Sequence, residues 1–399
     1  MAATNRRTRR RLLVAAGIGA VAGGAAHAEN SLDMKFLYYG ESDGRTKVYN
    51  PDVLFQWEVG EKGQLGVQLG YDSISGASPT GGAPTLDATT SASSGGSGTI
   101  PMVDYKDTRK AMSLSYGHRF GAHLPTVDLS YSKEDDYLSR GVSLVDEIRL
   151  PGGLTTLHVG AGIQRDHINP VLTQSEFRKE SLSASVGMTR VLGARDLFDA
   201  SFSLTQLDGY LTDPYKIVPV AASAVPEIRP DSRSRNSLVF KYGHYFLSRS
   251  ALKTSYRYYW DDWSISAHTL ETVWEKRLGE KWIVSPRVRY YRQGSASFFA
   301  YDFQAPERFM SADYRLSSFW SWLGGIGVRY QWTDQLAVDV SASYEKQTGL
   351  ERVKPPSVPV PLTGTDEGEG DEGGGGGSSS LSAADLDTVM LSVGFSFRF

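Results

Sequence analysis

The sequence ends LSVGFSFRF, residues 391–399, in strict alternation between apolar residues and small or polar ones. Side chains alternate sides along a strand, so this period of two indicates a strand with one apolar face. The residues of that face are Leu391, Val393, Phe395, Phe397 and Phe399. In water such a strand would be a sticky edge, and it is harmless only where its edge is paired and its apolar face meets lipid. The stretch therefore predicts the closing strand of a transmembrane β-barrel.

The other end of the chain predicts export. Five arginines within residues 6–11 precede an apolar stretch that runs from Leu12 to about Ala26, and Ala26-His27-Ala28 follows. This arrangement is typical of a secretory signal peptide, residues 1–28, cleaved after Ala28. The apolar run is too short, and too rich in Ala and Gly, for a membrane-anchoring helix. Cleavage would take the formal charge from −3 to −8, because the five arginines are lost with no acid.

Residues 29–399 contain a regular series of segments about ten residues long in which apolar residues alternate with polar or small ones, and QLGVQLGY (64–71) is the clearest. Short connections, such as 60–64 and 150–154, alternate with long ones, such as 208–235 and 293–311. This sorting is typical of outer-membrane barrels. We predict an all-β fold, an antiparallel transmembrane β-barrel of about 16 strands with long extracellular loops and short periplasmic turns.

The alternation is uneven in places. It is poorest at 139–149 and 264–275, where it does not fix the register of the predicted strands. Low-complexity loops are expected at 76–99 and 355–385, since their composition cannot bury enough apolar surface to fold alone. Five acids fall within 366–372, but they lack the spacing of a calcium-binding loop, so a solvated flexible loop is the favoured interpretation.

Several stretches resemble one protein family. They are SISGASP (73–79), YSKEDDYLS (131–139), GYLTDPYK (209–216) and SYRYYWDDWSISAHTLE (255–271). Together with the terminal phenylalanine strand they resemble the proteobacterial family known as domain of unknown function 3570 (DUF3570). The resemblance implies an outer-membrane barrel across the mature chain, and it implies no established activity or catalytic residue.

The inward face of the predicted barrel carries many charges. With the apolar face outward, the basic residues that point inward are Lys241, Lys253, Arg257, Arg287, Arg289, Arg315 and Arg329. The inward carboxylates are Asp128, Asp199 and Asp339. A basic wall facing carboxylates elsewhere would give a transverse field, as in aqueous pores that orient polar solutes. We therefore expect these residues, Arg315 included, to line a porin-like channel for polar or anionic small solutes.

Two alternatives to a channel stay open. Charges paired across a closed lumen would suit a scaffold or adhesin barrel, including one that holds a periplasmic redox partner. An outer-membrane hydrolase is the less favoured alternative, with candidate groups at His158 or His268 near serines and at Asp166/His167. Without Cys or a recognisable catalytic motif, we expect no enzyme activity, no metal and no cofactor.

Acidic clusters at the predicted rim, Glu134-Asp135-Asp136 and Asp261-Asp262, stand beside aromatic residues. They suit either a bound cation or basic partner, or simply solvated turns, which is the favoured interpretation.

The predicted location is the outer membrane of a Gram-negative bacterium. The expected partners are its lipid and lipopolysaccharide and the barrel assembly machinery, with no nucleic acid and an oligomeric state that the sequence does not define. The alternation that ends at Phe395, Phe397 and Phe399 resembles the signal that this machinery recognises, so deletion of Phe399 should reduce insertion.

Overall fold

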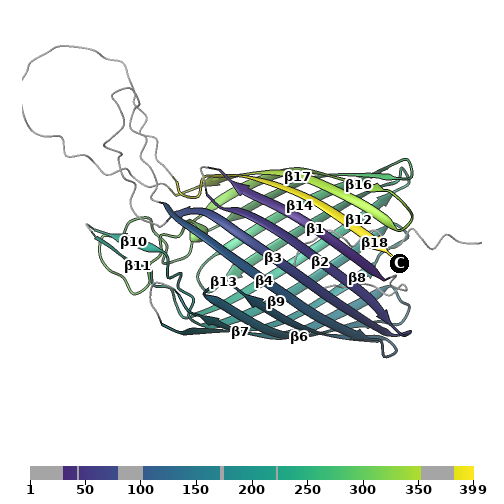
Figure 1. Cartoon of the computed structure of the whole chain (residues 1–399), viewed down its shortest axis with the longest axis horizontal. Helices are drawn as coiled ribbons and strands as arrows, with labels where there is room; N and C mark the ends of the chain where they lie inside the picture. The colour runs from purple at the N-terminus through teal and green to yellow at the C-terminus, as the bar shows by residue number, and fades with distance from the viewer. Residues whose placement is uncertain (1–29, 43–44, 80–101, 171–174, 222, 352–381) are drawn as a thin grey trace, which may run out of the picture.

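The chain folds into a closed antiparallel β-barrel in the computed structural model, which describes residues 30–42, 45–79, 102–170, 175–221, 223–351 and 382–399 (Figure 1). The sixteen barrel strands are β1 (Ser31–Glu41), β2 (Lys47–Val59), β3 (Gly63–Pro79), β4 (Met102–His118), β5 (His123–Lys133), β6 (Tyr137–Arg149), β7 (Thr155–Ile168), β8 (Phe177–Val191), β9 (Asp196–Gly209), β12 (Ser232–Phe246), β13 (Ser250–Asp261), β14 (Ser266–Leu278), β15 (Trp282–Gln293), β16 (Phe319–Gln331), β17 (Leu336–Gly349) and β18 (Leu386–Arg398). The predicted fold class is confirmed.

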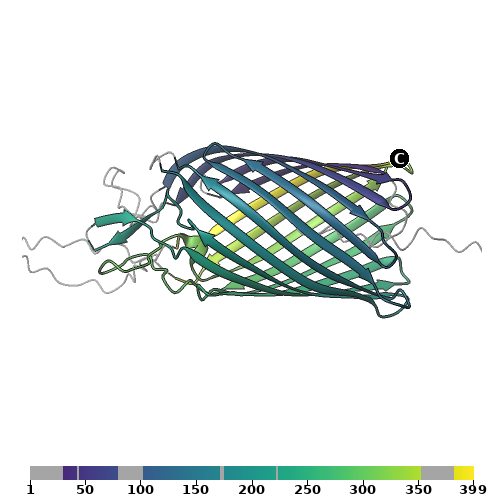
Figure 2. The same ribbon diagram turned by 90° about the horizontal axis from the view of Figure 1, so that it is seen from below.

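The barrel closes where its first and last strands meet. β1 pairs with β18 in antiparallel register, from Ser31 opposite Arg398 to Glu41 opposite Thr388. The start of β1 and the end of β18 lie at the same end of the barrel, where the connections between strands are short (Figures 1 and 2). We call this the short-turn end and the opposite one the long-loop end. The expected closure of the last strand against the first is confirmed.

Exposure alternates along the strands in the sense opposite to that of a soluble sheet. In β18, Leu391 is 47% exposed and Phe395 46%, whereas Ser392 between them is only 7% exposed. The apolar set therefore forms the outer face that meets lipid, and the small and polar set faces the lumen. The same alternation runs through the neighbouring strands, so the direction of each strand side chain follows from its place in the sequence.

The two stretches with poor alternation have continuous register. In β6, Asp146 shares the outer face with Leu144, and there it bonds the Nδ1 atom of His123 at 2.6 Å and accepts from the backbone N–H of Leu124. In β14, the ladder to β15 lacks two pairs beside Pro286, which has no N–H to donate. Asp146 thus has local partners on the outer face, and Pro286 accounts for the gap in the ladder between β14 and β15.

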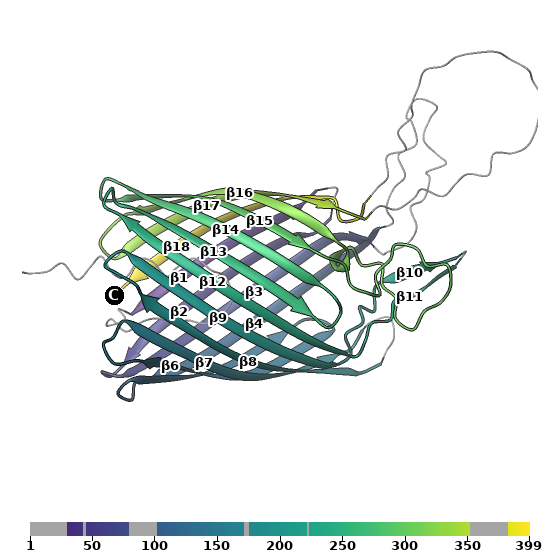
Figure 3. The same cartoon turned by 180° about the vertical axis from the view of Figure 1, so that it is seen from behind.

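The long-loop end carries ordered structure outside the barrel wall (Figure 3). A small hairpin of β10 (Ile217–Val220) and β11 (Ser223–Pro226) projects there, and the short 3₁₀ helix η2 (Tyr314–Leu316) lies between β15 and β16. This corrects two expectations. The stretch 208–235, expected as loop, contains the hairpin and the first residues of β12. Arg315, expected on an inward strand face, lies on η2, because the loop after β15 runs on to Ser318.

We call residues 210–221, 223–231 and 294–318 the cap, because apolar contacts hold them together. Val218 and Val220 pack with Phe303 and Met310 in one buried cluster. In a second cluster Trp263, from the β13–β14 turn, packs with Phe298 and Leu316. The cap is thereby joined to the barrel wall.

Some predicted features lie outside the described residues. These are the signal peptide at residues 1–28, the acid-rich stretch 366–372 and most of the two low-complexity loops. At the edges of those loops β3 extends to Pro79, and residues 382–385 lead directly into β18.

Candidate functional site

The predicted basic residues of the lumen lie on the inward face of β12, β13, β15 and β16. They alternate with exposed outer residues such as Phe240, Tyr256 and Val288, which fixes their direction. The six strand residues concerned are Lys241, Lys253, Arg257, Arg287, Arg289 and Arg329. In the sheet, Arg289 stands opposite Glu271 of β14 on one side and the buried Leu323 of β16 on the other.

Most of these bases have a carboxylate beside them. The ammonium of Lys253 lies 2.6 Å from the carboxylate of Glu275, and Arg289 reaches past β16 to Glu345 at 2.8 Å. Looser pairs join Lys241 to Asp199 at 3.8 Å and Arg329 to Asp339 at 3.9 Å. Carboxylates, some of them from the flanking strands β9 and β17, therefore stand close to four of the bases on this wall.

Arg257 and Arg287 differ from the other four. Within the described part of the chain, no carboxylate oxygen lies within 4.0 Å of either guanidinium. Arg257 lies over the ring of Tyr259, with 5.8 Å from its Cζ to the ring centroid, and Arg287 donates to the hydroxyl of Ser343 at 3.4 Å. These two guanidinium groups thus retain donors that a passing anion could engage. Asp128, the remaining predicted acid, stands inward on β5 between Ser115 and Ser143.

A pocket opens at the mouth of the lumen, at the long-loop end. Its basic lining comes from Arg229, Arg233, Arg235 and Lys179, and its aromatic lining includes Tyr210 and Trp263. Arg233 pairs with Asp261 at 2.5 Å and lies over the ring of Trp263, with its Cζ 4.1 Å from the centroid. The buried Nε of Arg235 has no hydrogen-bond partner among the described residues.

Sequence reasoning missed this pocket. Its arginines belong to a stretch in which the sequence predicts a loop, although Arg233 and Arg235 are two residues apart, the spacing of one face of a strand. Its other lining residues come from distant parts of the chain. Asp261, predicted as part of an acidic rim cluster, is instead the buried partner of Arg233.

The cap contains a buried ion cluster. Arg229 bridges two carboxylates, Glu227 at 2.7 Å and Asp313 at 2.9 Å, and Arg315 adds a contact of 2.8 Å to Asp313. Burial acts to raise the pKa of Asp313, but the charges of Arg315 and Arg229 outweigh it and lower that pKa to about 2. Burial raises the pKa of Glu227, against the opposing charge of Arg229. The cluster fixes segment 223–231 of the cap to segment 294–318.

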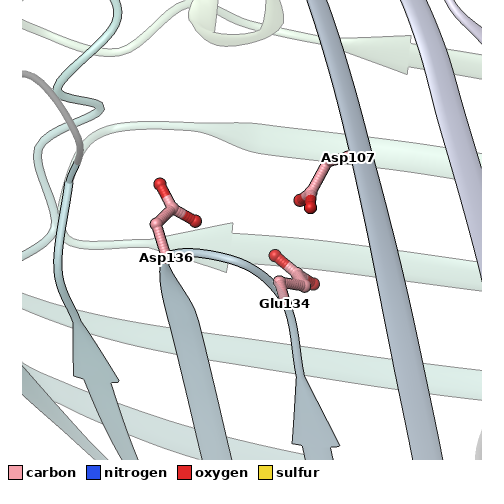
Figure 4. Close-up of side chains that lie close together, drawn as sticks. All are labelled: Asp107, Glu134 and Asp136. Atoms are coloured by element: carbon pink, nitrogen blue, oxygen red, sulfur yellow. The ribbon is translucent and has the colours of Figure 1, made fainter.

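An acidic triad is the one group of potential metal ligands found in the described residues. Asp107 of β4 meets Glu134 and Asp136 of the β5–β6 turn, with one oxygen from each within 4.8 Å of the others (Figure 4). Burial, with the charge of Asp107, raises the pKa of Glu134 to about 7. Oxygen donors of this kind suit Mg²⁺ or Ca²⁺. Exposed acids also gather without any ion, and Arg109 counters the charge here.

The predicted hydrolase groups do not assemble into a catalytic constellation. Asp166 faces inward to Lys179 at 2.9 Å, while His167, its neighbour along β7, falls on the outer face. His268 also faces outward, bonded to the hydroxyl of Tyr256. His158 bonds the hydroxyl of Thr189, which in turn bonds Asp199. A hydroxyl therefore occupies the middle position that a catalytic triad gives to the imidazole.

The terminal phenylalanines lie on the outer face at the short-turn end. Phe399 stacks on Phe397 and lies edge-on to Trp57, with ring centroids 5.6 and 6.0 Å apart respectively. Phe399 is 45% exposed, so it is available to lipid or to another protein. The recognition role expected for this strand stays a prediction.

The described residues and the solved structures that resemble this chain both bear on the kind of membrane protein it is. None of the described residues forms a helix long and apolar enough to cross a membrane. Among solved structures, the chain is similar to a bacterial polysaccharide outer membrane secretin, with a TM-score of 0.50, 9% identity, and coverage of 94% of this chain and 100% of that one. At this identity the likeness concerns the fold alone.

Two further structures are more distant. The monoaromatic hydrocarbon channel CymD gives a TM-score of 0.43 and 11% identity, over 94% of this chain and 89% of that one. The ferric enterobactin receptor PfeA gives 0.44 and 11%, over 83% of this chain and 56% of that one. No curated protein matches the sequence significantly. The family model described as protein of unknown function (DUF3570) matches residues 13–355, and the chain therefore belongs to that family.

Proposed function

We propose that the protein is a channel in the outer membrane of a Gram-negative bacterium and passes polar or anionic small solutes. The long-loop end would face outside and the short-turn end the periplasm, as in other barrels of this type. The signal peptide predicted at residues 1–28 supports export to that membrane.

The observation that carries the proposal is the solvent exposure of the charged side chains that face the lumen. The side chain of Lys241 points into the barrel and is 53% exposed, and those of Arg329 and Asp339 are 32% and 38% exposed. A lumen packed shut by side chains would leave such groups dry, and charges without water need close partners. Here the pairs are loose, at 3.8 and 3.9 Å, as in a water-filled interior.

The preference for anions rests on Arg257 and Arg287. Each offers a planar fork of donors that matches carboxylate or phosphate. The other four inward bases of the predicted set have carboxylates beside them, whereas these two have none within 4.0 Å among the described residues.

Planar-bilayer recording tests the proposal. The purified full chain should give steady conductance, with a reversal potential in a salt gradient that favours anions. Replacing both residues, Arg257→Glu with Arg287→Glu, should shift that potential toward cations. The control is Arg292→Gln, which neutralises a base on the outer face of β15, opposite Trp320, and should leave the potential unchanged. Silence in the bilayer would contradict the channel, and an unchanged potential in the double variant would contradict its selectivity.

A second candidate is a scaffold or adhesin barrel, and the cap favours it. Its buried apolar clusters and ion cluster make an ordered surface at the long-loop end, which a partner could bind. Under this alternative the bilayer stays silent, and removal of the β10–β11 hairpin abolishes attachment to a partner cell or protein without affecting the barrel.

A further inference from the structure

Basic residues gather on the outer face of β4 to β8, close to the long-loop end. The five, which we call the basic row, are Lys110, Lys133, Arg140, Arg165 and Arg178. Their direction follows from the register: the exposed outer residues Met112 and Tyr131 stand opposite each other, and Tyr131 stands opposite Arg140. All five are exposed.

Like charges stand directly opposite one another in this row. Lys110 is the cross-strand partner of Lys133, and Arg140 is that of Arg165. Directly opposed like charges destabilise a sheet, because their side chains start only about 5 Å apart. One carboxylate on the neighbouring strand, Glu180, pairs with Arg165 at 2.8 Å. The sheet itself thus leaves Lys110, Lys133 and Arg140 facing like charge with no acid opposite.

The row lies at a defined depth. Toward the middle of the barrel it is followed at once by apolar outer residues, Met112 on β4 and Val142 on β6. Toward the outside, Asp135 follows the end of β5 and Glu176 precedes the start of β8. The bases therefore stand at the boundary between the lipid chains and the headgroups, where Lys and Arg attract anionic lipid.

The rest of the outer face differs. At the long-loop end of the other described strands, the outward bases are Lys47, Arg292 and Lys346, and none has Lys or Arg as its cross-strand partner. Lys346, for example, stands between Trp322 and Asp387. The row is thus a local feature of one side of the barrel.

We propose that the basic row binds the phosphates of lipid A, the membrane anchor of lipopolysaccharide. The inference rests on the outer-membrane location given under the proposed function. A phosphate between opposed bases turns their repulsion into attraction, and Arg140 can grip it with two parallel hydrogen bonds. The acyl chains of the same molecule then lie on the apolar residues directly beneath.

Binding to the purified full chain in detergent tests this site without any need for conductance. Bisphosphorylated lipid A is titrated and measured by native mass spectrometry. The variant Lys133→Gln with Arg140→Gln should bind it about tenfold more weakly or worse. The control variant, Arg292→Gln with Lys346→Gln, removes the same charge from the other side of the barrel and should bind within about twofold of the parent. Equal weakening in both variants, or in neither, would overturn the site.

Two further arms identify the ligand and exclude a folding defect. Inorganic phosphate and dephosphorylated lipid A should each compete poorly, whereas full competition by inorganic phosphate would show a free-anion site instead. Without lipid, the Lys133/Arg140 variant should unfold at the same or a higher temperature than the parent, because repulsion has been relieved. A lower unfolding temperature would mean that the row is structural and would overturn the proposal. Absence of conductance in the planar bilayer would contradict the proposed channel, but it would not affect the measurement of lipid A binding.

Discussion

The lumen and the cap use the same ion-pairing side chains in opposite surroundings. Lumenal pairs such as Arg289 with Glu345 keep side-chain exposures of 33% and 18%, whereas Asp313 and Glu227 in the cap are each 2% exposed. Water screens the first kind, so each pair contributes little, and a buried charge that loses its partner is costly. Burial, rather than distance, should therefore decide which pairs hold the structure.

The largest effect is expected when a charge is removed from the cap. Asp313→Asn leaves Arg229 and Arg315 facing each other with only part of their compensation, at a cost of about 3–5 kcal/mol in local stability. Hydrogen exchange in lipid nanodiscs should show faster exchange in residues 294–318 and 223–231, with the barrel strands unchanged. The control is Asp302→Asn, at an exposed acid of the same segment. Equal protection in both variants would mean that the cluster does not hold the cap.

Acid should act on the same cluster more weakly. The folded pKa of Asp313, about 2, lies below its ordinary 3.8. Its stabilising contribution is therefore fully present above pH ~4 and is lost as the pH falls through about 2, a change of about 2 kcal/mol. Glu227, whose pKa is raised, takes up its proton at higher pH and so contributes little to the change between pH 4 and pH 2. Pepsin cleavage within 294–318 should accelerate between pH 4 and pH 2.

The matched comparison for the acid experiment is the Asp313→Asn variant, digested at each pH. It lacks the titrating group, so the ratio of its cleavage rate to that of the parent should fall toward one at pH 2. A ratio that stays constant across this range would show that Asp313 does not carry the acid sensitivity.

The smallest effect belongs to the lumen. A double-mutant cycle with Arg289→Gln and Glu345→Gln should give a coupling energy of about 0.2–1 kcal/mol, as for pairs within reach of water. Urea unfolding of the barrel provides the measurement, and the looser pair of Arg329 and Asp339 should give less. A coupling above about 2 kcal/mol would place the lumenal pair in the same class as the cap and remove the contrast.

The barrel could be predicted from the sequence because one physical rule applies to every strand. The alternation around Leu391 and Ser392 reports which side meets lipid, and the register then places Arg257 and Arg287 inward. The cap has no such rule. Arg315 follows the parity of a strand but lies on η2, because the contacts that hold it come from Asp313 and from Asp213, far away in the chain.

The same limit applies to the partners of the predicted site residues. The carboxylate that pairs with Arg289 is Glu345, two strands away. To predict this pair one must know how β16 aligns with both β15 and β17. The sequence contains the five residues of the basic row, but it does not show which of them stand opposite each other. That requires the alignment of β4 with β5 and of β6 with β7.

The pairing of β1 with β18 also sets an order of events. Ser31 and Arg398 are neighbours in the wall although almost the whole chain separates them, so this contact carries the largest loop-closure cost of any strand pair. Every other barrel strand can find its neighbour in sequence as a hairpin or a nearby strand. Until β18 arrives, the growing sheet has two open edges, each able to pair with a foreign strand. We therefore expect closure of this seam to be the last step of folding and to end the period in which the open edges expose the protein to aggregation.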